Sequence, residues 1–159
     1  PHLLPPLNEL AFAEQLQGCG VRILTRAGHT TEEVCGGGGG GLPSKSEVQL
    51  AVKRVREDFA FVGLTDQWAL SMCLGHRMLG GQCHLSDFVD TRITRGSTDI
   101  EIRATPEPWN VTSLHGFTDP HDGQLYEAGK EVFHSNLERY DASLKTCQPC
   151  FKEAGVRVH

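Results

Sequence analysis

The stretch Ser44–Gly81 constrains the fold of this chain more than any other part of the sequence. Ser44 and Glu47 have the spacing of a capping box, and apolar residues then recur at helical intervals between charged ones. The run Phe59–Leu64 is apolar without alternation, which is typical of a central strand covered on both faces. Thr65 is expected to cap a second, buried helix that ends at the glycine pair closing the stretch. Helix, strand and helix in this order predict an α/β fold with a parallel sheet.

The rest of the chain gives further predictions of secondary structure. Residues 7–17 read as a helix that a glycine ends, and residues 21–24 read as a short strand or an extended segment. Residues 99–103 alternate as a small strand. A long helix with an apolar face is predicted to begin at Asp119 or Asp122.

The glycine-rich segment 36–43 is predicted to be a flexible loop inside one domain of residues 1–159. A phosphate-binding loop is the alternative. That reading is disfavoured because Leu42 and Pro43 separate the glycines from Lys45–Ser46, and no convincing strand leads into the run.

Six cysteines in 159 residues predict a disulfide framework and an oxidising compartment, and they are Cys19, Cys35, Cys73, Cys83, Cys147 and Cys150. Pairing within the three local groups is the simplest connectivity, but the sequence leaves the connectivity open. The terminal C-x-x-C could be a redox pair; a structural disulfide is preferred because the motif follows a long helix instead of a strand. A zinc site with two histidines is a further alternative, although nothing fixes the second pair of ligands. Asn110 begins a glycosylation sequon, which also favours the secretory lumen.

The composition argues against several classes of function. The formal net charge is −5, without a basic stripe, so nucleic-acid binding has little support. No apolar run is long enough to cross a membrane, and no signal peptide is visible, so no membrane contact is predicted within this chain. Because the sequence begins at Pro1, we expect a fragment or a processed chain.

Several motifs together resemble a known enzyme family. FAFVGLTDQW, followed by a helix with Cys73 and His76, resembles the FxxVGxTE-aromatic element of the Golgi-type carbohydrate sulfotransferases, which include the heparan sulfate 2-O-sulfotransferases. Asp66 stands where that family often carries Glu. The upstream EVQLAVKRVREDF resembles the family's A-x-x-x-L helix, and DPHDGQLYEAGKEVF resembles its D-x-x-LY-x-x-A-x-x-xF helix. The resemblance covers roughly residues 16–151.

The resemblance implies the C-terminal portion of a P-loop-like, three-layer sulfotransferase fold, with a parallel sheet flanked by helices and stapled by disulfides. It implies an enzyme of the Golgi lumen that transfers a sulfuryl group from 3'-phosphoadenosine 5'-phosphosulfate to a carbohydrate hydroxyl, without a metal. Arg92, Arg95 and Ser97 lie in the loop that helps to hold the nucleotide end of this donor in the family. Guanidinium groups suit phosphate, although a solvated loop is the simpler interpretation.

The family's donor cradle is a short PK-x-G-x-T/S-like loop in its N-terminal half, and this sequence contains no such loop. The chain is therefore predicted to be inactive alone. His76 is expected to be a satisfied core residue, whereas His84, His115 and His121 lie in loops where a base is conceivable. The alternative is a disulfide-stapled secreted or lumenal module that binds or supports without catalysis. The catalytic residue, the acceptor sugar and the oligomeric state stay open.

Overall fold

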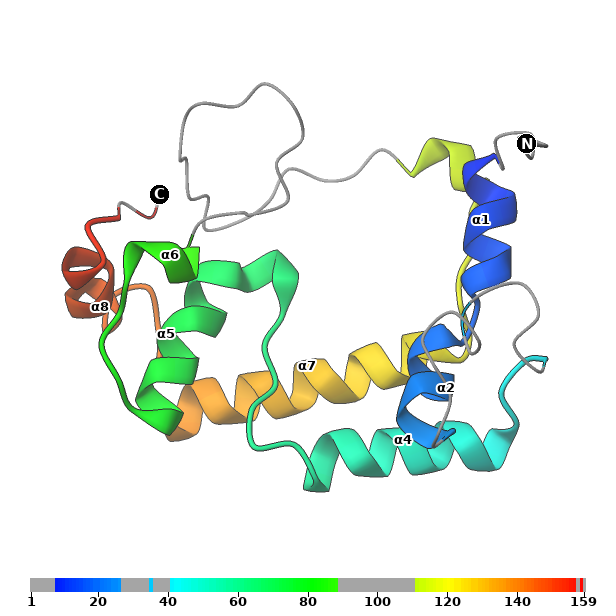
Figure 1. Cartoon of the computed structure of the whole chain (residues 1–159), viewed down its shortest axis with the longest axis horizontal. Coiled ribbons are helices and arrows are strands. Elements are labelled where there is room, and N and C mark those ends of the chain that lie inside the picture. Colours follow the sequence, from blue (N-terminus) through cyan, green and yellow to red (C-terminus); the bar gives the residue numbers. More distant parts are fainter. Residues whose placement is uncertain (1–7, 27–34, 36–40, 89–110, 157, 159) are drawn as a thin grey trace, which may run out of the picture. The chain divides into compact units, whose positions relative to one another are not determined.

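The computed structural model describes residues 8–26, 35, 41–88, 111–156 and 158 (Figure 1). Across these ranges the ordered elements are helices, and none of them is a strand or part of a sheet. The predicted α/β fold with a parallel sheet is therefore wrong. The chain divides into two compact units, which comprise residues 1–59 with 108–128 (unit 1) and residues 60–107 with 129–159 (unit 2).

The helical elements that the structure describes in unit 1 are α1 (Glu9–Leu16), α2 (Cys19–Thr25), α4 (Lys45–Glu57), the 3-10 turn η2 (Thr112–Leu114) and the first turns of α7 (Asp122–Arg139). The helix predicted at 7–17 is confirmed as α1, and Asn8 caps it by accepting a 2.7 Å hydrogen bond from the backbone of Ala11. The strand or extended segment predicted at 21–24 is wrong, because these residues form part of α2.

Two aspartates far along the chain explain why α2 is helical. The carboxylate of Asp122 accepts hydrogen bonds from the backbone N–H groups of Gly20, at 2.8 Å, and Val21, at 2.9 Å. Asp119 accepts from Gly18 at 2.6 Å and also from the first backbone N–H groups of α7. Helix N-termini leave such N–H groups without partners, and a carboxylate also matches the positive end of the helix dipole. The α2 helix therefore depends on contacts that its local sequence does not contain.

We expect Asp122→Ala to destabilise unit 1 by about 1–2 kcal/mol, as loss of a helix-capping side chain does. Asp122→Asn should cost about as much, because Gly20 and Val21 use different carboxylate oxygens and an amide keeps only one acceptor while it loses the charge. Hydrogen exchange of the α2 amides measures the effect locally. Unchanged exchange in Asp122→Ala would show that the carboxylate does not stabilise α2.

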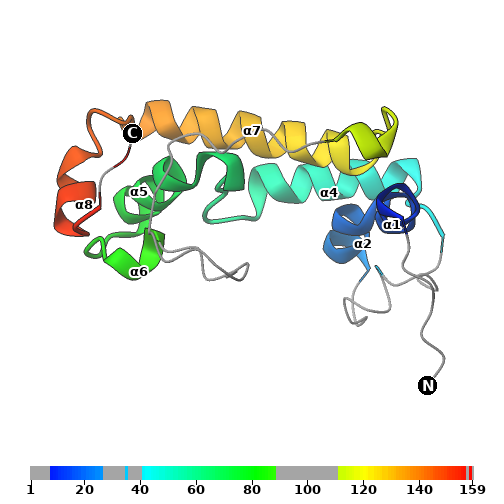
Figure 2. The same ribbon diagram turned by 90° about the horizontal axis from the view of Figure 1, so that it is seen from above.

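The helix predicted after Ser44 is confirmed as α4, with the capping box in place: Glu47 N–H donates to the Ser44 hydroxyl at 3.3 Å, and Ser44 N–H donates to the Glu47 carboxylate at 2.7 Å. Its buried positions are Val48, Ala51 and Val55. Figure 2 shows α2 lying beside α4, and their contact forms the small core of unit 1, made of Val21, Val48 and Ala51 with Leu24, Val52 and Leu125 packed around it. The disulfide Cys19–Cys35 ties residue 35 to the start of α2.

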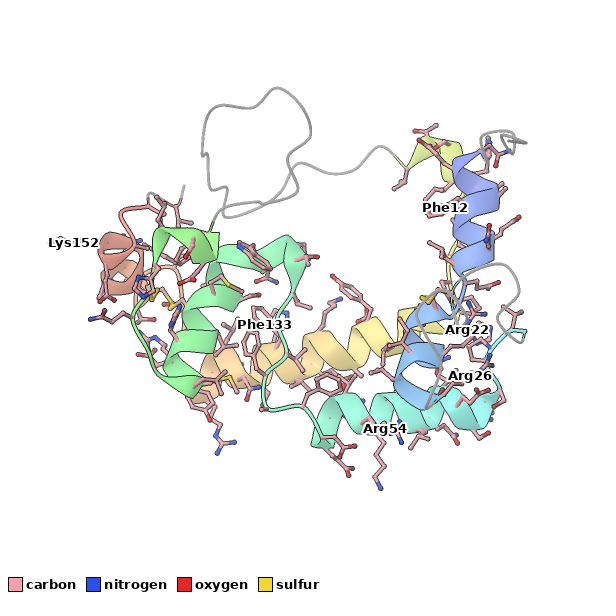
Figure 3. The ribbon with its side chains drawn as sticks, in the orientation of Figure 1. Phe12, Arg22, Arg26, Arg54, Phe133 and Lys152 are labelled. Atoms are coloured by element: carbon pink, nitrogen blue, oxygen red, sulfur yellow. A yellow bond between two sulfur atoms is a disulfide. The ribbon has the colours of Figure 1, made fainter. Side chains whose placement is uncertain are left out.

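Three arginines of unit 1 are held by groups of that unit (Figure 3). Arg22 is only 5% exposed and donates to the carbonyl of Gly41 at 3.1 Å. Arg54 donates to the carbonyl of Leu24. Arg26 pairs with Glu47 through a 2.8 Å contact between Nε and Oε1. Each guanidinium thus joins α2 to α4 or to the segment that precedes α4.

The Glu47 carboxylate gives unit 1 a pH dependence. Its hydrogen bond with Arg26, followed by those with Ser44, lowers the pKa of Glu47 from 4.5 to about 2. A carboxyl group whose folded pKa is depressed stabilises the fold above its unfolded pKa and loses that contribution as the pH falls. We therefore expect unit 1 to lose stability between pH 4.5 and about 2.

Urea unfolding followed by unit 1 amides at a series of pH values checks this expectation. Glu47→Gln should lower the stability at neutral pH and flatten the acid limb. Glu57→Gln is the matched control, because Glu57 makes only an exposed contact with Lys53 at 3.8 Å. If the stability of unit 1 fell as steeply with decreasing pH in Glu47→Gln as in the unchanged chain, Glu47 would not be the source of the acid sensitivity.

Unit 2 contains the 3-10 turn η1 (Thr65–Gln67), α5 (Trp68–Leu79), α6 (Leu85–Phe88), the remainder of α7 and α8 (Gln148–Glu153) (Figure 1). The strand predicted at Phe59–Leu64 is wrong, because this segment is not paired with any strand of the described residues. Its last residue is fixed instead by Ser71, whose buried hydroxyl accepts from the Leu64 N–H at 2.8 Å and donates to the Leu64 carbonyl at 2.9 Å.

The second predicted helix is confirmed as α5, but its surroundings differ from the prediction. Thr65 does not cap it; Thr65 begins η1, and α5 follows from Gln67 without a side-chain cap. The helix is not fully buried either, because Trp68 is 39% and Leu79 is 68% exposed. The predicted stop is confirmed at Gly80, whose φ of 80° lies in the left-handed region that favours glycine.

The core of unit 2 packs α5 against α6, α8 and the second part of α7. Its buried members include Leu74, Phe88, Phe133 and Phe151, and the rings of Phe88 and Phe151 meet edge to face at 5.8 Å. The long helix predicted from Asp119 or Asp122 is confirmed as α7. It closes with Asp141 in the left-handed conformation, where Ala142 N–H donates to the Leu137 carbonyl, as in a Schellman motif.

All six cysteines form disulfides, which confirms the predicted framework. In unit 2 the pairing is not local: Cys73 bonds to Cys147, and Cys83 bonds to Cys150. The two cysteines of the C-x-x-C motif therefore staple α8 to two different segments, α5 and the loop that follows it. None of the helices in the described ranges combines the length and the apolar character that a membrane span requires.

Candidate functional site

A surface pocket of about 640 Å³ lies in unit 2, lined by residues of α5, of the loop after it and of the α8 region. The polar residues on its wall are His76, Arg77, Thr146, Lys152 and Glu153. Both long-range disulfides belong to the wall, through Cys73, Cys83 and Cys150. The pocket is thus held by covalent bonds as well as by the core behind it.

Arg77 is fixed by the end of α7 and the turn that follows it. Its Nη1 donates to the carbonyls of Tyr140 and Asp141, both at 2.9 Å, and its Nη2 donates to the carbonyl of Thr146 at 2.5 Å. The last carbonyls of a helix lack partners within the helix, so a guanidinium is well placed there. These acceptors are neutral, so they orient the guanidinium without cancelling its formal charge.

His76 is oriented by the residues around α6. Its Nε2 lies 3.0 Å from Asp87 Oδ2, which also accepts the N–H of His84 at 2.8 Å. The hydrogen bond from the backbone N–H of His84, followed by that from His76, lowers the pKa of Asp87 below its ordinary value. Trp68 adds a 3.0 Å hydrogen bond from its indole to the Asp87 carbonyl. Asp87 therefore joins α6 to α5 in two ways: its carboxylate contacts His76, and its backbone carbonyl accepts the indole N–H of Trp68.

The second nitrogen of His76 is left without a partner. Its Nδ1 is buried, and no hydrogen-bond partner is found for it among the described residues. The prediction that His76 is a satisfied core residue is thus only half met, because one of its two ring nitrogens is satisfied and its side chain is 23% exposed.

Lys152 and Glu153 bring opposite charges to the pocket from α8 (Figure 3). Glu153 accepts the backbone N–H of Cys83 at 3.3 Å, so its carboxylate is directed toward the neighbouring disulfide loop. Lys152 is exposed, and none of the described carboxylates forms an ion pair with it. The formal charges of Arg77, Lys152 and Glu153 leave the lining with one surplus positive charge in a chain whose formal net charge is −5.

Of the residues singled out from the sequence, His76 and three of the cysteines line this pocket, whereas the predicted donor-binding residues are not among its lining residues. Arg92, Arg95 and Ser97, the predicted donor-phosphate residues, and the sequon residue Asn110 lie outside the described residues. Of the loop histidines, His84 borders α6 and His121 donates its backbone N–H to Asp119. Most of the flexible loop predicted at 36–43, and the strand predicted at 99–103, also lie outside the described ranges.

The zinc alternative does not fit the cysteine chemistry. Zinc requires thiolates, whereas Cys147 and Cys150 are both bonded in disulfides. Within the described residues, no cluster of three or more histidine, cysteine or carboxylate side chains is arranged to hold a metal.

Sequence reasoning did not select Arg77, Lys152 or Asp87. Arg77 and Lys152 are exposed cations without a motif, and they line one pocket although 75 positions separate them in the sequence. Asp87 carries only a weak sequence signal, its place three residues after His84, at which a carboxylate in the first turn can accept the N–H of the residue that precedes the helix.

Comparisons with known proteins add no relative to these observations: the chain matches no protein-family model, no curated protein and no solved structure.

Proposed function

We propose that this chain is part of a carbohydrate sulfotransferase, which transfers a sulfuryl group from 3'-phosphoadenosine 5'-phosphosulfate to a carbohydrate hydroxyl. One observation carries the proposal: three motifs resemble that family in the same order and with similar spacing. Two of them fall on α4 and α7, and the third runs from the extended segment at 59–64 into α5. The sheet is not part of this proposal, because the described residues are helical.

The roles that we propose for this chain and for the rest of the enzyme follow from the residues present. Sulfuryl transfer depends on positioning the two substrates and on stabilising negative charge, as phosphoryl transfer does. Arg92, Arg95 and Ser97 would contact a phosphate of the donor, since guanidinium and hydroxyl groups match phosphate oxygens. The sequence has no loop of the PK-x-G-x-T/S type, so the donor cradle must come from outside this chain. Alone, the chain would then bind the donor weakly and would not turn over.

The three disulfides support a location in an oxidising compartment, and we propose that the protein functions in the Golgi lumen or the extracellular space. The partner would be a carbohydrate acceptor. Glycosylation at Asn110 would be consistent with the same compartment.

Calorimetry with 3'-phosphoadenosine 5'-phosphate tests the proposal on this chain and on the longest product of the same gene. We expect the longer product to bind, and Arg92→Gln together with Arg95→Gln to weaken that binding. The control is Arg56→Gln, a change of the same type on α4. If two well-folded proteins both fail to bind the nucleotide, the sulfotransferase proposal is wrong.

A second candidate is a disulfide-stapled lumenal or secreted module that binds a ligand without catalysis. The observation that favours it is the pocket of unit 2, whose wall includes both long-range disulfides. A rigid wall lowers the conformational entropy that binding must overcome. Failure of nucleotide binding together with specific ligand binding in this pocket would favour the module over the enzyme.

A further inference from the structure

We propose that the pocket of unit 2 is a binding site for a small organic molecule that carries a sulfate or phosphate ester. This inference does not depend on the sulfotransferase proposal. It rests on the charge, the rigidity and the size of the pocket lined by Arg77, Lys152 and Thr146.

Arg77 supplies an oriented cation. Its guanidinium is fixed by three backbone carbonyls at 2.5–2.9 Å, and these carbonyls carry no net charge. A guanidinium has five N–H donors, and its Nε is not engaged in these three contacts. An oxyanion at the wall of the pocket would therefore meet a donor that is already in position, with little side-chain entropy left to lose.

Lys152 supplies the second cation from α8 (Figure 3). The nearest acidic residue in the sequence, Glu153, is engaged with the N–H of Cys83, and no ion pair with Lys152 is present in the described residues. Lysine binds phosphate and sulfate groups as a point charge on a flexible stem. Two such cations from different segments suit the oxygens of one sulfate or phosphate ester group.

The remaining wall suits the organic part of the ligand. At about 640 Å³ the pocket lies within the usual range for small-molecule sites, roughly 300–1,000 Å³, and is far larger than an isolated sulfate ion requires. The disulfide-bonded cysteines and Pro149 give apolar surface beside the polar lining residues. The space beside the cations is thus sized for a molecule that carries the oxyanion, instead of the ion alone.

The disulfides link the backbone segments that carry the two cations. Cys73–Cys147 joins α5, which carries Arg77, to the start of α8, which carries Lys152. Cys83 and Cys150, which form the second disulfide, also line the pocket. Such preorganisation lowers the cost of binding.

Isothermal titration of the oxidised chain tests the proposal with glucose 6-sulfate, glucose 6-phosphate, uncharged glucose and inorganic sulfate. We expect one molecule of either ester to bind, glucose not to bind, and inorganic sulfate to bind more weakly. Lys152→Gln should weaken ester binding about fivefold, and Lys152→Glu by more than tenfold. Lys145→Gln is the matched control, because Lys145 is an exposed lysine of the same unit that does not line the pocket.

Lys152 is exposed, so its variants are expected to fold, and far-ultraviolet circular dichroism checks this. Inorganic sulfate that binds as tightly as the esters, with the same response to Lys152→Glu, would keep an oxyanion site but overturn the organic ligand. Absence of ester binding would overturn the proposal. Equal weakening by Lys145→Gln and Lys152→Gln would also overturn it, because that result would report the net charge alone. Nucleotide binding by the longer gene product is measured separately, so the two proposals fail independently.

Discussion

Removal of both long-range disulfides, in the variant Cys73→Ala/Cys83→Ala/Cys147→Ala/Cys150→Ala, is expected to abolish the folded state of unit 2. Removal of either disulfide alone is expected to leave a folded but weaker unit. The reason lies in the way the two covalent loops overlap along the chain. Their sequence separations are 74 and 67 residues, and each loop contains one cysteine of the other.

A disulfide stabilises a fold mainly by restricting the unfolded chain, and its contribution grows with the length of the loop that it closes. When Cys83–Cys150 is intact, the shortest path between Cys73 and Cys147 runs through it and spans only roughly a dozen residues. Loss of one disulfide should therefore cost about 3 kcal/mol, whereas loss of both should cost about 7 kcal/mol. The larger figure is comparable with the whole stability of a typical domain.

Hydrogen exchange of α5 and α8 amides measures the effect within unit 2, since two units need not unfold as one two-state system. The control is Cys19→Ala/Cys35→Ala, which removes a disulfide of unit 1 and should leave exchange in α5 unchanged. Additive losses, with each single removal costing half of the combined value, would contradict the argument from overlapping loops.

The sequence correctly predicts the helices α1, α4, α5 and α7 but wrongly predicts a sheet, and the difference has a physical cause. Caps and stops are local signals, so Ser44 with Glu47 and the glycine at position 80 place helix ends correctly. A strand is a pairing relation, and Phe59–Leu64 supplies only one partner of such a pair. An apolar run can mark a buried strand or simply an extended connection, and its periodicity does not distinguish them.

Residues 21–24 show the opposite error. Their β-branched residues suggest an extended segment, yet the N-terminus of α2 is stabilised by Asp119 and Asp122, about a hundred positions away in the chain. Tertiary hydrogen bonds thus override a weak local preference. Such contacts become visible only once the fold brings the beginning of α7 beside α2.

The candidate site could not be predicted for a similar reason. The sequence predicts that all six cysteines are paired, but the grouping of neighbours suggests local bonds, whereas the core of unit 2 brings Cys73 to Cys147. Arg77 and Lys152 line one pocket because the same core and the same pairing bring α5 and α8 together. The residues that a family resemblance did single out, Arg92, Arg95 and Ser97, lie outside the described residues.

Phe133→Ala is expected to destabilise unit 2 by about 3–5 kcal/mol, the usual cost of replacing a fully buried aromatic ring by a methyl group. Phe133 lies on α7 with 0% of its surface exposed (Figure 3), in the core that also contains Leu74 and Phe151. The loss combines the transfer of the ring from water with the cavity that its neighbours cannot fill. Here the disulfides restrict how far α5 and α8 can relax into that cavity, so we expect a value near the upper end.

Phe12→Ala is the matched control, because Phe12 is also on a helix but is 52% exposed (Figure 3), and its loss should cost less than about 1 kcal/mol. Urea unfolding followed by hydrogen exchange within each unit separates the two effects. Phe133→Leu retains most of the apolar volume and should recover much of the stability. If Phe133→Ala and Phe12→Ala lowered the free energy of unfolding equally, α7 would not pack into the core of unit 2 as described. The structural basis of the pocket beside that core would then also be wrong.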